Sequence, residues 1–289
     1  MAHIDDLKEN PLKRKALLVS LSISQWPGTK KDQKAARDAE TSNGAEEGTI
    51  KGIKYLIPKT AIKAVQQKAT EIRSYHDRVT LPWRKGIDLL PTSLYLEYTQ
   101  EVQRLTNQFH AAAEQHIFID YPYFVATAPQ RLQSLYNPMD YPDLEDLKKR
   151  YSVRTEIEPI PDRPDPRLEV PDLDELTKAI EEATQSRFEE AQKELYNRLE
   201  TALAHCADTL RDPDKNRFHE TLITNIQDLV NIIPHHNITQ DQRLNQIAQE
   251  ITQKITPYTE ESLKGDSLYR QQVRSDADAI LEAMKGLYA

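Results

Sequence analysis

Glycine is unevenly distributed along this chain, and its distribution limits the fold more than any other feature. Five of the seven glycines lie from Gly28 to Gly86, and none occurs from Ile87 to Lys264. A long glycine-free stretch that is rich in Gln, Glu, Leu and Ala favours helix. The sequence therefore predicts an amino-terminal part with turns, followed by long helices.

The amino-terminal part contains two short apolar runs separated by a polar connection. Residues 16–23 are Ala-Leu-Leu-Val-Ser-Leu-Ser-Ile, and residues 50–57 are Ile-Lys-Gly-Ile-Lys-Tyr-Leu-Ile. Runs of this length and alternation are typical of β-strands. We expect the two runs to pair with each other around a mobile loop over residues 30–49.

The residues that follow predict a mixture of helices and extended segments. Apolar spacings of three and four predict helices over residues 60–75 and 91–116. Residues 143–149 predict a short helix, because their acidic start and basic end suit the helix dipole. Residues 78–86 and 153–160 have the pattern of strands. The proline-rich stretch 161–171 is expected to be a linker.

The carboxyl-terminal part has narrow apolar stripes. Residues 172–212 place apolar side chains at near-heptad spacing, and three similar helices are expected over residues 218–233, 244–255 and 273–287. Such stripes favour an antiparallel bundle or a helical hairpin. The predicted fold is α+β, with a small antiparallel sheet and helices in a domain over residues 1–165. A helical domain over residues 166–289 follows it.

Charge differs between the two ends of the chain. Residues 1–90 contain 17 Lys and Arg against 11 Asp and Glu, a balance of +6, whereas the remainder contains 21 against 35, a balance of −14. The net charge of the whole chain is −8. A basic front and an acidic rear indicate a nucleic acid or another anionic partner for the front. The alternative is a solvated surface with uneven charge.

Cysteine content and hydropathy place the chain in an ordinary soluble class. Cys206 is the single cysteine, so no disulfide forms within the chain. No apolar run reaches the roughly 20 residues that span a bilayer. We expect a cytoplasmic protein with no membrane role, and the sequence has no signal-peptide pattern at its start.

Motifs of catalysis and cofactor binding are missing from the sequence. It has no Gly-x-Gly-x-x-Gly, no phosphate-binding Gly-Lys-Ser/Thr loop and no Gly-x-Ser-x-Gly elbow. His205 and Cys206 are neighbours that face different ways on a helix, so we interpret Cys206 as a small core residue. No cofactor is expected, and the protein is expected not to be an enzyme.

Metal binding is a further alternative at three places. His235-His236 follows a proline, and adjacent histidines point apart, which favours a solvated loop over a metal site. Two acidic groups have the ligand types for Mg²⁺, or they serve as helix caps and surface charges. These groups are Asp172/Asp174/Glu175 and Asp276/Asp278/Glu282.

The strongest constellation combines tryptophan with adjacent cations. Single-stranded nucleic acid is bound by cationic grooves for phosphate and by aromatic faces on which bases stack. The alternative is that both indoles lie in the core and the cations are merely solvated. The candidate nucleic-acid-binding residues are Trp26, Lys30, Lys31, Lys34, Arg37, Trp83, Arg84 and Lys85.

Three segments resemble an uncharacterised family, the DUF3150 domain family. They are residues 18–26 (LVSLSISQW), 136–142 (YNPMDYP) and 156–161 (EIEPIP). The family is met in phages and mobile elements, sometimes near MoxR-type AAA+ ATPases and von Willebrand-type partners. The resemblance extends from residue 13 to the carboxyl end and implies no catalytic residues. The order strand, loop, strand, helix is also similar to phage single-strand annealing proteins, which form oligomers on DNA.

Three hypotheses follow. The first is a non-enzymatic protein that binds single-stranded nucleic acid, DNA in particular, through its basic and aromatic loops and forms homo-oligomers through its helices. The second is a scaffold or adaptor whose helical part docks an AAA+ ATPase or another protein without contacting nucleic acid. The third is a metal-dependent nuclease.

Overall fold

The computed structural model describes residues 11–161, 171–211 and 221–286. The chain forms two compact units. Unit 1 comprises residues 1–20, 77–96 and 157–289, and unit 2 comprises residues 21–76 and 97–156. Because both units combine separated segments, they do not coincide with a division after residue 165. That expected boundary, with most of the expected linker, falls outside the described residues.

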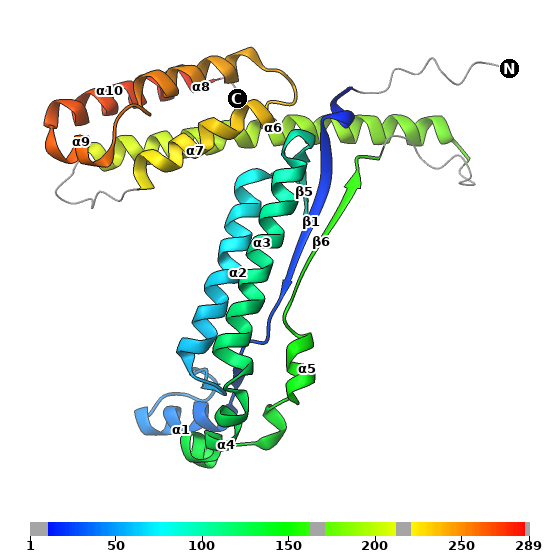
Figure 1. Ribbon diagram of the computed structural model, residues 1–289, viewed down its shortest axis with the longest axis vertical. Coiled ribbons are helices and arrows are strands. Elements are labelled where there is room, and N and C mark those ends of the chain that lie inside the picture. The colour runs from blue at the N-terminus through cyan, green and yellow to red at the C-terminus, as the bar shows by residue number, and fades with distance from the viewer. Residues whose placement is uncertain (1–10, 162–170, 212–220, 287–289) are drawn as a thin grey trace. The chain divides into compact units, whose positions relative to one another are not determined.

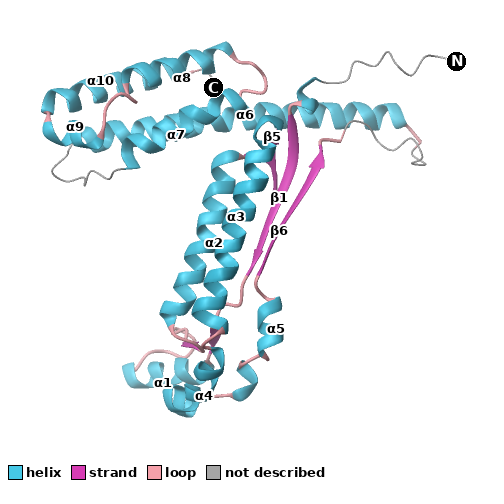
Figure 2. Cartoon of the chain, in the orientation of Figure 1, coloured by secondary structure: helices cyan, strands magenta, loops and turns pink. Residues whose placement is uncertain are grey.

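One sheet has four strands in the order β4-β5-β1-β6, and Figure 2 labels β5, β1 and β6 among them. β1 runs antiparallel to β5, with Ala16 opposite Pro91 and Val19 opposite Asp88. β4 and β5 form a hairpin whose turn contains Gly86 at φ +76°, a left-handed conformation that glycine adopts without strain. The strands are β1 Ala16–Ser24, β4 Leu81–Arg84, β5 Ile87–Pro91 and β6 Ser152–Pro159.

The helices of unit 1 pack around an apolar core. α6 lies against α7 and α10, and α8 contacts α7 and α10 (Figure 1). The fully buried Leu195, Leu199 and Leu203 form the inner stripe of α6, as the spacing of four predicts. The same core includes Leu18 and Leu89 of the sheet. The helices are α6 Leu173–Arg211, α7 Thr221–His236, α8 Gln242–Lys254, α9 Glu260–Gly265 and α10 Ser267–Met284.

Unit 2 is built on the pair α2 and α3, which lie side by side (Figure 1). The buried Tyr98 ring stacks on Tyr75, and its hydroxyl lies 2.8 Å from His76 Nδ1. A separate two-stranded sheet, β2–β3, belongs to this unit. The helices assigned wholly or mainly to it are α1 Gln33–Asn43, α2 Lys59–Val79, α3 Tyr95–Ala113, α4 Tyr121–Leu132 and α5 Leu144–Lys149, and the strands are β2 Thr29–Lys31 and β3 Ile53–Tyr55.

Short helical turns connect these elements. A π-helical turn follows α3, and the other turns are 3₁₀ helices. They are η1 Pro11–Arg14, η2 Thr92–Leu94, the π turn η3 Glu114–Phe118, η4 Gln133–Leu135 and η5 Pro138–Asp140.

The α+β prediction is confirmed, but two parts of the amino-terminal prediction are wrong. β1 pairs with β5 rather than with β3, whose partner is β2. The expected mobile loop instead contains the helix α1. The side chain of Asp32 caps the start of this helix by accepting from Ala35 N at 3.1 Å. Gly44 ends α1 at φ +63°.

Candidate functional site

The two-stranded β2–β3 sheet carries two of the predicted cations on opposite faces. Lys30 lies opposite Lys54, and Lys31 lies opposite Ile53. Because side chains alternate along a strand, Lys30 and Lys54 share one face, while Lys31, Ile53 and Tyr55 share the other. Ile53 is 56% exposed and Tyr55 is 39% exposed. The outer face therefore combines a cation with apolar and aromatic surface.

The inner face of the β2–β3 sheet forms a buried ion network. Lys54 Nζ lies 2.9 Å from Asp32 Oδ2 and 2.9 Å from Asp140 Oδ2, and it donates to Leu135 O at 2.7 Å. Lys30 Nζ adds a contact of 2.5 Å to Asp140 Oδ1. The side chain of Asp140 is 1% exposed and that of Lys54 is 7% exposed. A buried charge requires partners of this kind.

The pKa values of the network follow from these contacts. Burial opposes the charged form of Lys54, but the hydrogen bonds with Asp140 and Asp32 raise its pKa above the ordinary value. The pKa of Asp140 is lowered, because Lys30 and Lys54 outweigh the effect of its burial. The hydrogen bond from Lys54 is the main cause that lowers the pKa of Asp32. All three groups are therefore charged at neutral pH.

The other two cations predicted in this region lie on α1. Lys34 and Arg37 are both exposed, and Arg37 Nη2 lies 3.5 Å from Glu47 Oε1. Unit 2 thus gathers four of the predicted cations on β2 and α1. One of them, Lys30, is held by Asp140 and is part of the fold.

Trp26 is a core residue of unit 2. The indole is only 6% exposed and meets the ring of Tyr121 edge-on, with ring centres 6.0 Å apart. The hydroxyl of Tyr151 donates to Trp26 O at 3.3 Å. A ring enclosed in this way has no free face for a base, so the prediction that Trp26 stacks bases is wrong.

Trp83 belongs to the core of unit 1. It is 5% exposed and packs edge-on against Phe188 at 5.2 Å, while the guanidinium of Arg187 lies 5.6 Å from its ring centre. Arg84 and Lys85, which follow it at the end of the β4 strand, are exposed. The alternation of β4 turns the indole inward, so the stacking prediction is wrong for Trp83 as well.

Sequence reasoning missed the two residues at the centre of the ion network, Lys54 and Asp140. A signal for Lys54 exists, because it lies between Gly52 and Leu56 on the inner side of the alternating run. Asp140 gives no comparable signal, since it lies in the short turn η5 and meets Lys54 only through the tertiary fold.

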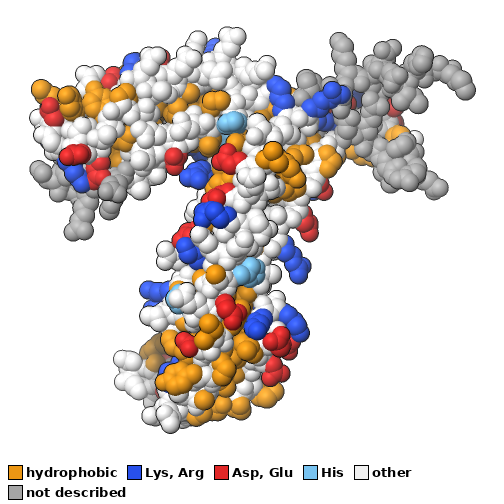
Figure 3. All heavy atoms as spheres, in the orientation of Figure 1, with side chains coloured by type: hydrophobic (Ala, Val, Ile, Leu, Met, Phe, Trp, Pro, Cys, Tyr) orange, Lys and Arg blue, Asp and Glu red, His pale blue; other side chains and the backbone are white. Residues whose placement is uncertain are grey.

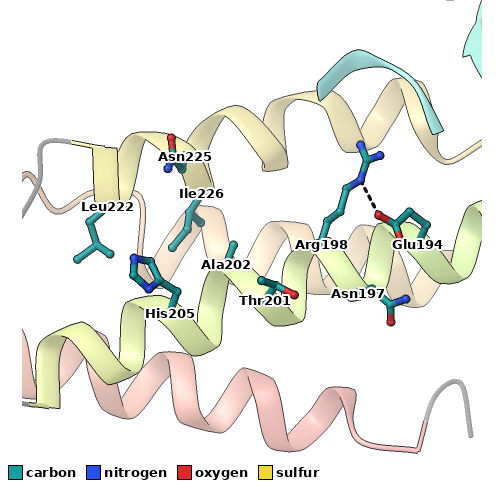
Figure 4. Close-up of a pocket in the computed structure, with 9 residues that line it drawn as sticks. All are labelled: Glu194, Asn197, Arg198, Thr201, Ala202, His205, Leu222, Asn225 and Ile226. Atoms are coloured by element: carbon teal, nitrogen blue, oxygen red, sulfur yellow. Dashed lines mark hydrogen bonds and ion pairs between the residues drawn. The ribbon is translucent and has the colours of Figure 1, made fainter. Parts of the chain in front are cut away.

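Unit 1 contains a groove of about 500 Å³ between α6 and α7. In Figure 4 the side chains of Ala202 and His205 extend from α6 toward Ile226 and Leu222 of α7. Ile226 and Leu222 are buried and Ala202 is half-buried, so the floor of the groove is apolar. At one end Arg198 Nε and Glu194 Oε1 form an ion pair of 3.1 Å.

The walls of this groove are polar but mostly uncharged. Besides the ion pair, the lining side chains are amides, a hydroxyl and one imidazole, from Asn197, Thr201, His205 and Asn225. Their spacing of four along α6 places Asn197, Thr201 and His205 in one row. The arrangement offers an apolar strip bordered by hydrogen-bonding groups.

The thiol next to His205 is sequestered, as predicted. Cys206 is fully buried, and burial raises its pKa to about 12. The thiolate that would act as a nucleophile is therefore scarce at neutral pH.

The histidine pair differs from the predicted solvated loop. His235 is exposed, with Nδ1 3.0 Å from Ser93 Oγ. His236 is buried in the last turn of α7, with its ring nitrogens 3.0 Å from Ile232 O and from Val79 O. Burial lowers the pKa of His236 to about 4. The solvated-loop prediction is therefore wrong for His236, which is a core residue.

The acidic groups considered for Mg²⁺ have local helix partners. Asp172 accepts from Glu175 N at 2.9 Å, Asp276 accepts from Gln272 Nε2 at 2.9 Å, and Asp278 lies 3.6 Å from Arg274. Within residues 11–161, 171–211 and 221–286, no three His, Cys, Asp or Glu side chains come together in a way that could hold a metal ion.

No family model, curated protein or solved structure matches this chain. The resemblance to the DUF3150 family stays a prediction. Of the helices in the described part of the chain, none is both long enough and apolar enough to cross a bilayer.

Proposed function

We propose that this protein is a non-enzymatic adaptor that binds a helical segment of a partner protein in the groove between α6 and α7. The observation that carries this proposal is the groove itself, with an apolar floor of Ala202, Leu222 and Ile226. A third helix packs into the furrow between two helices by inserting its side chains there. The partner segment is therefore an amphipathic helix.

The chemistry of the walls specifies this helix further. Asn197, Thr201, His205 and Asn225 border the floor and are hydrogen-bonding groups without a fixed charge. A helix with apolar side chains on one face and Ser, Thr, Asn or Gln beside them satisfies both kinds of surface. A strongly charged helix would lose hydration without gaining an opposite charge.

A non-enzymatic role is supported by the state of the groups considered for catalysis. The Cys206 thiol is buried with a raised pKa, and His236 is enclosed between two backbone carbonyls. The acidic groups at Asp172 and Asp276 serve neighbouring helix residues. Each of these groups has a structural role that accounts for it.

The resemblance to the DUF3150 family suggests a MoxR-type AAA+ ATPase as the first partner to test. The full chain would be used to capture proteins from cells of its source, and the captured protein would be identified, purified and titrated by calorimetry. Ala202→Arg fills the groove with a charged side chain, so we expect affinity to fall roughly a hundredfold. Ala111→Arg on α3 of unit 2, at an exposed alanine, is the matched control. Equal affinity of the two variants would reject the groove.

A second candidate function, binding of single-stranded nucleic acid, is supported by the outer face of the β2–β3 sheet. This face carries Lys31 beside the exposed Ile53 and Tyr55, and Lys59 Nζ lies 5.6 Å from the centre of the Tyr55 ring. Tyr55 would take the stacking role first expected of Trp26, with Lys31 and Lys34 on phosphates.

This second candidate is tested by fluorescence anisotropy with a labelled oligothymidylate. If it holds, the double variant Lys31→Glu/Lys34→Glu abolishes binding, and wild-type affinity falls steeply with salt. Arg84→Glu/Lys85→Glu in unit 1 is the matched control of equal charge change. Absence of wild-type binding at low salt would leave the adaptor function alone.

A further inference from the structure

A polar cavity of about 640 Å³ lies in unit 1, beside the connection between α7 and α8. Its walls come from three separated parts of the chain, which are the residue before β1, the turn η2 and the segment from the end of α7 into α8. Hydrogen bonds join these parts, because Thr92 N donates to Lys15 O at 2.9 Å and Lys15 Nζ donates to Ile238 O at 3.2 Å. The polar side chains that line the cavity include Lys15, Ser93, His235, Gln240, Gln242 and Asn245.

The lining of this cavity is positively charged. Among the described residues that line it, Lys15 is the one with a fixed charge. Asp241, which lies between two lining residues, is held toward α6, where its Oδ2 accepts from the Tyr196 hydroxyl at 2.7 Å. Figure 3 shows Lys and Arg side chains around the start of β1, which η1 and its two basic last residues precede. A cavity with this charge attracts an anion.

The cavity offers several hydrogen-bond donors to such an anion. In the part of the chain that the structure describes, Lys15 Nζ uses one of its three N–H groups, on a backbone carbonyl. Ser93 Oγ and His235 Nδ1 lie 3.0 Å apart. Whichever of the two donates the shared proton, the pair keeps one further O–H or N–H group for a ligand. Asn245 Oδ1 accepts from Asn237 Nδ2 at 2.9 Å, so the amino group of Asn245 is the part left for the cavity.

The backbone of the cavity wall is strained at Gln240. Its φ is +60°, in the left-handed region that residues other than glycine rarely adopt. The turn is held by Asn237, whose side-chain amide accepts from Asp241 N and donates to Asp241 O, both at 2.8 Å. Strained positions that neighbouring groups enforce in this way cluster at ligand-binding sites.

We propose that this cavity binds a small phosphorylated molecule, either a sugar phosphate or a nucleoside monophosphate. The phosphate group lies at Lys15, Ser93 and His235, whose donors approach from the three different parts of the wall. Lysine is a compact point charge that suits a tetrahedral phosphate. Arginine, which matches a planar carboxylate with two parallel hydrogen bonds, is not among the described residues that line the cavity.

The rest of the cavity fits the body of the ligand. A volume of about 640 Å³ is typical of sites for small molecules and exceeds what a phosphate group alone fills. The amides of Gln240 and Gln242 both donate and accept, as the hydroxyl groups of a sugar require. The lining residues differ from those of the groove between α6 and α7, so this site does not depend on the adaptor function.

Phosphorus NMR of the full chain at low salt tests the proposal with inorganic phosphate, ribose 5-phosphate and adenosine 5′-monophosphate. We expect the resonance of each compound to broaden, and the two larger compounds to bind at least roughly tenfold more tightly than phosphate. Ribose and adenosine, which lack the phosphate group, should not compete. Tighter binding of the adenosine compound than of ribose 5-phosphate assigns the site to nucleotides, and equal or weaker binding assigns it to sugar phosphates.

The charge of Lys15 is tested by substitution. Lys15→Gln keeps a donor for Ile238 O but removes the charge, so it should weaken the binding of ribose 5-phosphate at least roughly tenfold. Lys51→Gln, at an exposed lysine of unit 2, is the matched control. Ser93→Ala, at an exposed serine, should weaken binding roughly threefold and keeps the test decisive if Lys15→Gln does not fold. Far-UV circular dichroism verifies the fold of each variant.

A variant at Gln240 separates binding from folding. Gln240→Gly removes the strain together with one lining amide, so the variant should be at least as stable to heat as the wild type and should bind ribose 5-phosphate more weakly. The proposal is overturned if none of the three phosphorus compounds binds at roughly 10 mM, or if ribose or adenosine competes. Binding by Lys15→Gln that is as tight as binding by Lys51→Gln also overturns it.

Discussion

The core of unit 1 is apolar, whereas unit 2 contains buried charges. Among the described residues, the buried Lys, Asp and Glu side chains are Lys54, Asp140 and Glu40, and all three belong to unit 2. Glu40 accepts from the backbone of Gly48 and Ile50, and the other two share the ion network. Unit 1 instead packs leucine stripes of its helices against the sheet. The stability of an apolar core depends on how well its side chains fill the volume, whereas the stability of a buried ion network depends on every partner being present.

The largest expected effect is loss of the Trp83 ring from the core of unit 1. Trp83→Ala removes a 5% exposed indole that packs on Phe188, and it should lower the free energy of unfolding by about 4 kcal/mol. Urea denaturation followed by circular dichroism measures this change. A loss below about 1 kcal/mol would mean that the ring is exposed and that the core of unit 1 is wrongly described.

The next effect concerns the ion network of unit 2. Lys54→Met should lower the free energy of unfolding by about 3 kcal/mol, because it leaves Asp32 and Asp140 without their shared partner. The control is Lys51→Met at an exposed lysine, which should change the free energy of unfolding by about 0.5 kcal/mol at most. The Trp83→Phe background makes Trp26 the sole tryptophan, so its fluorescence reports unit 2. Equal effects of Lys54→Met and Lys51→Met on the free energy of unfolding would contradict a stabilising ion network in unit 2.

A backbone contact gives a smaller effect in the same unit. A Cβ at Gly52 would lie 2.4 Å from Asp32 O and 2.7 Å from Ala36 N, so Gly52→Ala should cost about 2 kcal/mol by pushing β3 away from α1. Gly265→Ala in α9 is the control, because its Cβ meets no atom within 4 Å, and a slight gain is expected. Thermal denaturation of both variants provides the measurement.

Acidification should gradually reduce the stability that the ion network gives to unit 2. The folded-state pKa values of Asp32 and Asp140 lie below the ordinary 3.8, so their contribution is present above that pH and is lost as pH falls through the folded values. The difference in stability between wild type and Lys54→Met should therefore be smaller near pH 3 than at pH 7. A difference that is the same at both pH values would contradict the assignment of the network.

Basic pH acts on the same network through Lys54. Its folded-state pKa lies above the ordinary 10.5, so its contribution is present below 10.5 and is lost as pH rises through the folded value. Neutral pH is therefore the range in which the whole network stabilises unit 2.

Local pattern predicted the elements well, because each depends on nearby residues. The leucine spacing of α6 and the alternation around Ile157 of β6 are readable in the sequence. Strand pairing was not readable, since β1 finds β5 across a long connection that includes α1 and α2. The exposure of Trp26 and Trp83 depends on Tyr121 and Phe188, which lie far along the chain. The sequence left open whether the two indoles stack on bases or lie in the core, and the structure places both in the core.

The most direct test of the adaptor function is amide hydrogen exchange on the full chain, with and without the captured partner protein. The groove predicts added protection over residues 194–205 of α6 and 222–226 of α7. Protection confined to residues 29–59, which include the β2–β3 sheet, would contradict the groove and place the binding surface on that sheet.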